Sequence, residues 1–391
     1  MKKNLCNTIL VLLVTHLSVA LNAQDWTSVP FGKGLINVYS QDSSWSAKIS
    51  SRIQTRYDGL YVYTTDTAFK DDPFHDRAYV RRARIKGEGH AYSPKVKYKF
   101  EYDVLSGTVL DAVVKWNFVG NLSVWFGQTK LPGNVERVIS SQKLQFVDRS
   151  MLNSKFNIDR DAGIQFRHHM KLGPMLIREA LAITQGEGLN QKGFSSGHCY
   201  TGRIELLPMG EFTKKGDYYA SDLAREAKPK IMLGFTYSYN VNAERTGGQL
   251  GSYTVNGMRD LQTIFADLVI KYKGISVMVE YADRQTNGTP ITAGTWDSEG
   301  VLLSVDEAFL TGTALNAQLG YLFKSNWELA ARYTQFNPNI SLVADDATEY
   351  TFGISRYVVG HNLKVQADFT WIQEENNYDN MEVRLQTEFS F

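Results

Sequence analysis

The chain has 391 residues, of which 43% are hydrophobic and 12% aromatic, with 42 lysines and arginines against 41 acidic residues. This near-neutral balance gives no electrostatic basis for binding nucleic acid, so only a local clustering of charge could attract anions. No run of about 18 apolar residues occurs after the first 23 residues, which excludes membrane-spanning helices.

The N-terminus has the features of a secretory signal peptide. Lys2 and Lys3 precede a short apolar run, and small residues around Ala23 favour cleavage there. A membrane anchor is disfavoured because the apolar run is too short to cross a bilayer. We therefore expect residues 1–23 to be removed, which leaves 40 basic residues against 41 acidic ones and a formal net charge of −1.

A polar segment, 24–44, follows the predicted cleavage point. Cys6 lies within the predicted signal peptide, so Cys199 is the one cysteine expected in the mature chain, and no disulfide can form.

Alternation of polar and apolar residues dominates the remainder of the chain. It is clearest over 95–104, where odd positions are charged and even positions are aromatic or β-branched. Because successive side chains of a strand point to opposite faces, such a segment predicts a strand with one charged and one apolar face. Sixteen segments of this kind are predicted, at residues 45–57, 77–90, 95–104, 110–119, 122–127, 161–170, 175–184, 199–207, 230–240, 261–272, 275–284, 312–323, 327–336, 349–357, 363–371 and 381–391.

The connections between these segments alternate between short and long. Tight turns are expected after the even-numbered segments, and long polar loops after most of the odd-numbered ones. An even number of strands with short turns at one end and long loops at the other is typical of a transmembrane β-barrel. The connection 208–229 departs from this rule, because it is long but belongs by parity to the short-turn end.

A soluble all-β sandwich is the main structural alternative. Its two sheets would share a core dominated by aliphatic side chains, whereas here one face of many strands carries lysine, arginine and acidic residues. A wide, water-filled lumen tolerates such a face, and ring closure removes the sheet edges. The sequence therefore predicts an all-β fold: an antiparallel transmembrane barrel of about sixteen strands spanning 45–391.

Five short segments resemble the phosphate-selective porin O/P family. They are Arg-Arg-Ala-Arg-Ile-Lys-Gly at 81–87, 98–103, Phe-Gly-Gln-Thr-Lys-Leu-Pro at 126–132, Phe-Val-Asp-Arg-Ser at 146–150 and Arg-Asp-Ala-Gly-Ile-Gln at 160–165. The resemblance implies a sixteen-stranded, usually trimeric outer-membrane barrel. Its anion path would consist of a ladder of arginines and a cluster of lysines, narrowed by an inward-folded loop. A periplasmic turn that also folds inward would account for 208–229.

Cations cluster between residues 77 and 99, where eight lysines and arginines stand against one acid, Glu88. Two adjacent strands would present these side chains to the lumen, where rows of cations concentrate anions. Arginine binds phosphate and carboxylate through its planar fork, and lysine acts as a mobile point charge. The candidate pore-lining residues on these strands are Arg82, Arg84, Lys86, Lys95, Lys97 and Lys99. Alternatively, the same cations pair across strands with Glu101, Asp103 and Asp111.

The loop 128–160 corresponds by position and motif to the constriction loop of the family. Its candidate anion-binding residues are Lys130, Arg137, Lys143 and Arg149. Within it, residues 138–146 are predicted to form a short helix held against the wall by Ile139, Leu144 and Phe146.

Catalytic and metal-binding motifs are not found in the sequence. His168 and His169 are adjacent, so on a strand they face opposite sides and cannot share a metal ion. Neither a phosphate-binding GxxxxGK[ST] loop nor a GxSxG motif occurs. We expect no cofactor, no enzymatic activity and no nucleic-acid partner.

The predicted function is diffusion of small anions, such as phosphate or polyphosphate, across a bacterial outer membrane. The alternatives are a general porin without ion preference, and an outer-membrane adhesin or barrel enzyme.

Overall fold

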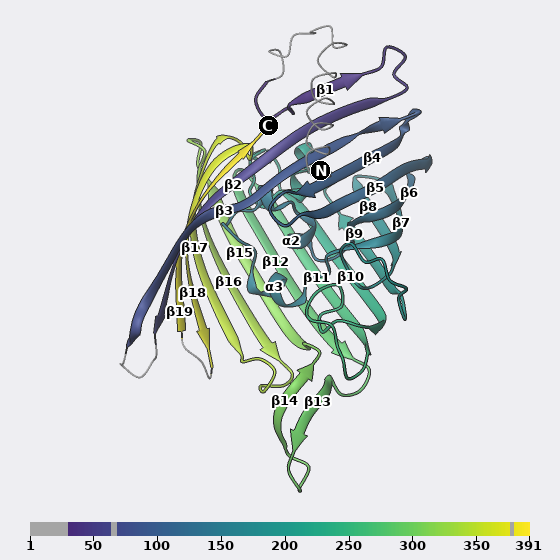
Figure 1. The fold of residues 1–391 in the computed structure, drawn as a ribbon. Coiled ribbons are helices and arrows are strands. Elements are labelled where there is room, and N and C mark those ends of the chain that lie inside the picture. Colours follow the sequence, from purple (N-terminus) through teal and green to yellow (C-terminus); the bar gives the residue numbers. More distant parts are fainter. Residues whose placement is uncertain (1–29, 64–68, 376–378) are drawn as a thin grey trace, which may run out of the picture.

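Sixteen antiparallel strands close into a barrel in the computed structural model, which describes residues 30–63, 69–375 and 379–391 (Figure 1). The predicted signal peptide lies outside the described residues. The strands of the ring are β2 (Ser46–Tyr63), β3 (Phe69–Ala91), β4 (Ser93–Asp103), β5 (Thr108–Val119), β6 (Leu122–Lys130), β7 (Arg160–Leu172), β8 (Met175–Thr184), β9 (Cys199–Leu207), β10 (Lys230–Ala243), β11 (Arg259–Tyr272), β12 (Ile275–Thr286), β15 (Gly312–Leu322), β16 (Trp327–Pro338), β17 (Ala347–Val359), β18 (Leu363–Glu374) and β19 (Asp379–Ser390). Each pairs with the next, and β19 pairs with β2 to close the ring.

The all-β barrel predicted from alternation is confirmed, and each of the sixteen predicted segments coincides with one strand of the ring. Two expectations about the connections were wrong. Much of the loop expected between residues 57 and 77 is strand, because β2 and β3 continue to pair as far as Tyr63 and Phe69. The loop expected between residues 284 and 312 contains the hairpin of β13 (Ile291–Trp296) and β14 (Leu302–Ala308). A short strand, β1 (Ile36–Tyr39), also pairs with the start of β2.

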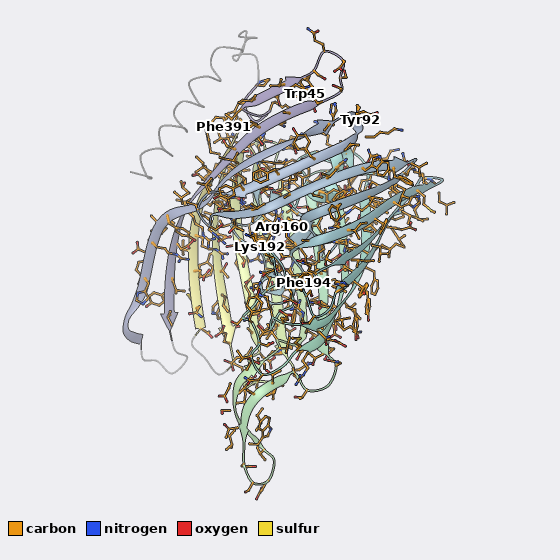
Figure 2. The ribbon with its side chains drawn as sticks, turned by 45° about the vertical axis from the view of Figure 1, so that its right-hand side comes forward. Trp45, Tyr92, Arg160, Lys192, Phe194 and Phe391 are labelled. Atoms are coloured by element: carbon orange, nitrogen blue, oxygen red, sulfur yellow. The ribbon has the colours of Figure 1, made fainter. Side chains whose placement is uncertain are left out.

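The two ends of the barrel differ as the sequence predicts. Short turns join β3 to β4, β5 to β6, β7 to β8 and β11 to β12 at one end, while the β13–β14 hairpin projects from the other end (Figure 1). At Lys273 and Gly274 both φ angles are positive, 48° and 92°, as the right-handed twist of a two-residue hairpin requires. Trp45, Tyr92 and Phe391 lie at the short-turn end (Figure 2).

The two faces of the wall have opposite polarity. Large apolar side chains such as Phe126, Leu329 and Phe352 are exposed on the outer face. On the inner face many polar side chains are buried, and those at most 1% exposed include Gln54, Glu280, Asn316, Thr334, Thr351 and Gln366. A barrel in a bilayer requires this arrangement, with apolar side chains facing lipid and polar ones facing the lumen. Among the described residues, no helix has the length and apolar character needed to cross a bilayer.

Candidate functional site

The connection between β6 and β7, residues 131–159, folds back into the barrel. It contains two α-helices, α2 (Val135–Val138) and α3 (Met151–Phe156), and a 3-10 helix, η1 (Ser141–Lys143). Leu152 and Phe156 of α3 are completely buried against wall residues that include Phe265 and Phe336. The rings of Phe156 and Phe336 lie 5.5 Å apart. Apolar packing therefore holds this segment inside the ring of strands (Figure 1).

The helix predicted over 138–146 was wrong. Only the three-residue turn η1 lies within this range, since α2 ends at Val138 and α3 begins at Met151, and Leu144 is extended, with φ −72° and ψ 153°. Ser150 begins α3 by accepting a hydrogen bond from the N–H of Asn153 at 3.2 Å. Between the helices, the backbone carbonyls of Leu144 and Gln145 accept hydrogen bonds from side chains of the barrel wall.

The connection 208–229 also enters the barrel, from the short-turn end. Its 3-10 segment η2 (Thr213–Tyr218) follows Phe212, which is buried in the same apolar cluster as Ile139 and Leu144 of the first segment. The ammonium of Lys271 on β11 donates to the carbonyls of Gly216, Tyr219 and Ser221 at 2.6–2.7 Å. The N–H of Ala220 donates to the carbonyl of Lys143 at 3.0 Å, so the two inward segments are in contact.

Arginines of β2 and β3 face the inward segment 131–159. Asp148 of the inward segment lies among three of them, with its carboxylate 2.7 Å from Arg56, 3.7 Å from Arg81 and 4.0 Å from Arg82. Farther toward the short-turn end, Arg52 forms two hydrogen bonds to Glu388, at 2.9 and 3.0 Å. Guanidinium groups of β2 and β3 therefore surround one tethered carboxylate of the inward segment.

Burial and charge act in opposite directions on the carboxyl of Asp148. Burial alone would raise its pKa, but Arg82, Arg56 and Arg81 together hold the pKa well below its ordinary value. Burial lowers the pKa of Arg149 in the same segment to about 10. Both groups are therefore charged at neutral pH, and Arg149 donates to the carbonyls of Glu136 and Ile139.

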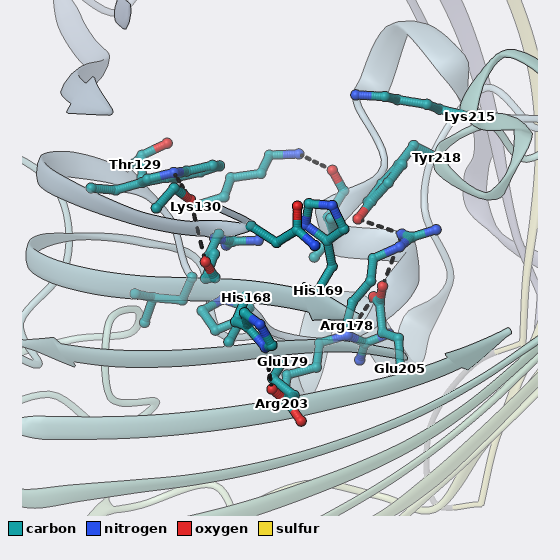
Figure 3. Close-up of a pocket in the computed structure, with 18 of the residues that line it drawn as sticks. Thr129, Lys130, His168, His169, Arg178, Glu179, Arg203, Glu205, Lys215 and Tyr218 are labelled. Carbon is teal, nitrogen blue, oxygen red and sulfur yellow. Dashed lines mark hydrogen bonds and ion pairs between the residues drawn. The ribbon is translucent and has the colours of Figure 1, made fainter. Parts of the chain in front are cut away.

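Two cavities open at the short-turn end, with volumes of about 650 and 260 Å³. Lys99 of β4 and Lys143 of the inward segment belong to both. The larger cavity is lined by eight lysines and arginines and three carboxylates, so its wall carries a positive charge. The eight cations are Lys99, Lys130, Lys143, Arg167, Arg178, Arg203, Lys214 and Lys215. Tyr218 and Glu205 converge on Arg178 in this cavity, at 2.8 and 3.0 Å (Figure 3).

The candidate residues from the strands fall into two groups. Arg82, Arg84, Lys86 and Lys99 belong to the inner face, and Arg84 and Lys99 are paired across strands, with Asp103 at 2.9 Å and Asp111 at 2.6 Å. These contacts are the cross-strand pairs that the sequence offered as an alternative to anion binding. Lys95 and Lys97 are exposed near the β3–β4 turn, away from the narrow part of the lumen.

The four candidates from the loop have different surroundings. The ammonium of Lys130 donates to the carbonyls of Arg137, Val138 and Ile139 at the end of α2, and Arg137 is paired with Asp159. Among the described residues Lys143 forms no ion pair, and its ammonium lies 3.8 Å from the centroid of the Tyr219 ring. Lys143 is thus the candidate whose charge stays uncompensated within the cavities.

Several cations of the inner face were missed in the sequence. On β2, Arg52 and Arg56 occupy alternate positions with Gln54, so the polar face of this strand was a signal that could have identified them. Lys115 and Arg167 both lie against the Trp125 ring, at 3.7 and 4.2 Å from its centroid. Their proximity depends on the pairing of β5, β6 and β7 and could not be anticipated from one strand.

Histidines do not form a metal site in the described part of the chain. His168 is paired with Glu179, at 2.9 Å between Nδ1 and Oε2, while His169 lies opposite Arg178 in the strand register (Figure 3). No group of three or more His, Cys, Asp or Glu side chains suited to a metal ion occurs in the ranges that the structure describes.

Solved structures with similar folds are outer-membrane channels at low sequence identity. An anion-selective porin from Comamonas acidovorans is 9% identical, with a TM-score of 0.53, and the match covers 89% of this chain and 100% of that one. The outer-membrane channel DcaP of Acinetobacter baumannii is 12% identical, with a TM-score of 0.51 and coverage of 91% and 100%. OmpT of Vibrio cholerae is 11% identical, with a TM-score of 0.51 and coverage of 90% and 99%.

No curated protein sequence is a significant match to the chain. The family model described as phosphate-selective porin O and P matches residues 48–246, which make up half of the chain. The matched region contains the inward segment 131–159, the connection 208–229 and the arginines of β2 and β3. The chain belongs to the phosphate-selective porin O and P family and is a porin of the bacterial outer membrane.

Proposed function

We propose that this porin favours small anions over cations as they diffuse through the gap between residues 131–159 and the β2–β3 wall. The path would run from the long-loop end past Asp148 and Arg82 into the two cavities at the short-turn end. A porin performs no bond chemistry, so its selectivity depends on the charges and the width along this path.

The excess of cations in the larger cavity is the observation that carries this proposal. Eight lysines and arginines stand there against three carboxylates, although the whole chain is nearly neutral. Cations gathered in a cleft with low-dielectric walls raise the local concentration of anions. The description of the family as phosphate-selective and the anion selectivity of the Comamonas acidovorans porin support the same preference.

A general porin without ion preference is the second candidate, and the ion pairs of the inner wall favour it. Arg84 with Asp103, Arg52 with Glu388 and Arg384 with Asp368 each neutralise a cation that would otherwise attract anions. The reversal potential of the purified porin in a salt gradient separates the two candidates. Anion selectivity gives a chloride-to-potassium permeability ratio well above one, whereas a ratio of one or below favours the general porin.

Replacing Lys143 by glutamate is expected to lower this permeability ratio. The substitution places a negative charge where both cavities meet, and a change of about 1.4 kcal/mol in the free energy of an anion there changes its local population about tenfold. We expect a fall of roughly threefold to tenfold, measured from reversal potentials in planar bilayers.

The matched control for Lys143→Glu is Lys95→Glu, which makes the same change of charge at an exposed position beside the β3–β4 turn. It should leave the permeability ratio nearly unchanged. An equal effect of the two substitutions would show that Lys143 does not lie on the conducting path.

A further inference from the structure

The inward segment 131–159 is bonded along residues 144–148 to the inner face of β18, which β19 separates from the arginine-bearing β2. Lys364 of β18 donates to the carbonyl of Leu144 at 2.9 Å, and Gln366 of the same strand donates to that of Gln145 at 2.9 Å. The N–H of Val147 donates to Asp368, also of β18, at 2.8 Å. This stretch is therefore an extended chain fixed to the inner face of β18 by its own backbone.

Its side chains reach neighbouring strands. The amide of Gln145 donates to Ser276 of β12 at 2.9 Å and to Glu328 of β16 at 2.7 Å. The guanidinium of Arg332 on β16 lies 4.7 Å from the centroid of the Phe146 ring. Together with the bonds to β18, these contacts to β12 and β16 fix the position of this stretch across the wall.

Two glycines of the wall lie directly beneath these side chains. A Cβ atom on Gly320 of β15 would collide with the amide nitrogen of Gln145. A Cβ atom on Gly353 of β17 would approach the Phe146 ring to 2.9 Å at Cδ1 and 3.1 Å at Cε1. Neither glycine has a positive φ, so the backbone does not require glycine at either position. The remaining common reason for glycine inside a strand is that another segment of the protein approaches the strand closely.

We propose that Gly320 and Gly353 are positioning residues that set the width of the conducting gap. They let residues 144–148 sink into the wall formed by β15–β18. Because the interior is close-packed, a side chain at either position must push the segment away from these strands and farther into the lumen. This inference rests on the proposed function in one respect, namely that solutes pass between the segment and the β2–β3 wall.

The test is the single-channel conductance of Gly353→Val in symmetric potassium chloride. We expect it to fall by roughly half or more, because a shift of the order of one methyl group removes a large share of a narrow water-filled path. The matched control is Gly202→Val on β9, where an added Cβ meets nothing within 4 Å. Heat-modifiable migration on gels checks that each variant forms a barrel.

A second substitution tests the contact itself. Removing the ring in the double variant Gly353→Val, Phe146→Ala should restore most of the lost conductance, because the added valine then has no aromatic ring to collide with. If Gly353→Val does not form a barrel, Gly353→Ala adds only the Cβ and is compared with its own Phe146→Ala double variant. Equal conductance of Gly353→Val and Gly202→Val would overturn the proposal, as would a loss that Phe146→Ala does not relieve.

Conductance and ion preference are measured separately. The positioning proposal predicts a lower conductance at a nearly unchanged reversal potential, because the charges along the path are the same. A fall in conductance in a porin whose wild type shows no anion preference would leave the positioning role intact while removing the proposed selectivity.

Discussion

Replacing Asp148 by asparagine should increase both the anion preference of the porin and its block by phosphate. In the structure the Asp148 carboxylate contacts Arg56 and lies within 4.0 Å of Arg81 and Arg82, so a solute anion must compete with it for the same guanidinium groups. The amide keeps the size of the side chain but has no charge. We expect inorganic phosphate to block chloride current at a concentration roughly tenfold lower than in the wild type, which corresponds to about 1.4 kcal/mol.

Single-channel recordings in chloride with added phosphate measure this effect. The control is Glu299→Gln, which removes one negative charge from the exposed turn between β13 and β14. Because salt screens charges beyond about 10 Å, this distant change should leave the block unaltered. Identical phosphate block in the two variants would show that the arginines around Asp148 do not bind permeating anions.

Replacing Lys271 by methionine should release the connection 208–229 from the barrel wall. The ammonium of Lys271 is the donor to three backbone carbonyls of this connection, and the side chain is 1% exposed. Each buried acceptor left without a donor costs about 1–3 kcal/mol, so the local free energy of unfolding should fall by several kcal/mol. The strands keep their own hydrogen bonds, so the barrel itself should persist.

Trypsin measures this release directly, because the connection carries Lys214 and Lys215 immediately before the buried Gly216 and Asp217. Local opening admits the protease, so Lys271→Met should be cleaved within 208–229 much faster than the wild type, and its current should fluctuate more. Lys273→Met alters an exposed lysine two residues away and should behave as the wild type does. Equal cleavage of the two variants would mean that the three hydrogen bonds do not hold the connection.

The barrel could be predicted from the sequence because its wall is a local pattern. The alternation of polar and apolar residues predicted both ends of β9, residues 199 and 207. The polar face of each strand could likewise be predicted without knowing which strands lie beside it. The hairpin β13–β14 was missed because residues 291–308 are rich in turn formers and interrupt the alternation at Gly294 and Gly300. Hydrogen bonding between the two strands stabilises it there.

The contacts inside the barrel were less accessible to prediction, because they join residues far apart in the chain. Arg52 and Glu388 are 336 positions apart, and nothing in either segment identifies the other. Lys130 illustrates a different reason. As a cation in the expected constriction loop it was a candidate for anion binding, but its three donors are occupied by carbonyls at the end of α2. The sequence shows the charge of a side chain but not which acceptors it is hydrogen-bonded to.

The junction of β19 with β2 has a consequence for how the protein reaches its membrane. Until β19 has been synthesised, β2 and β18 each present a row of unpaired N–H and C=O groups, which hydrocarbon cannot solvate. A chain lacking β19 could not seal, so barrel closure in lipid must follow the synthesis of this strand. Until then the strands already made form an unsealed sheet or an unfolded chain.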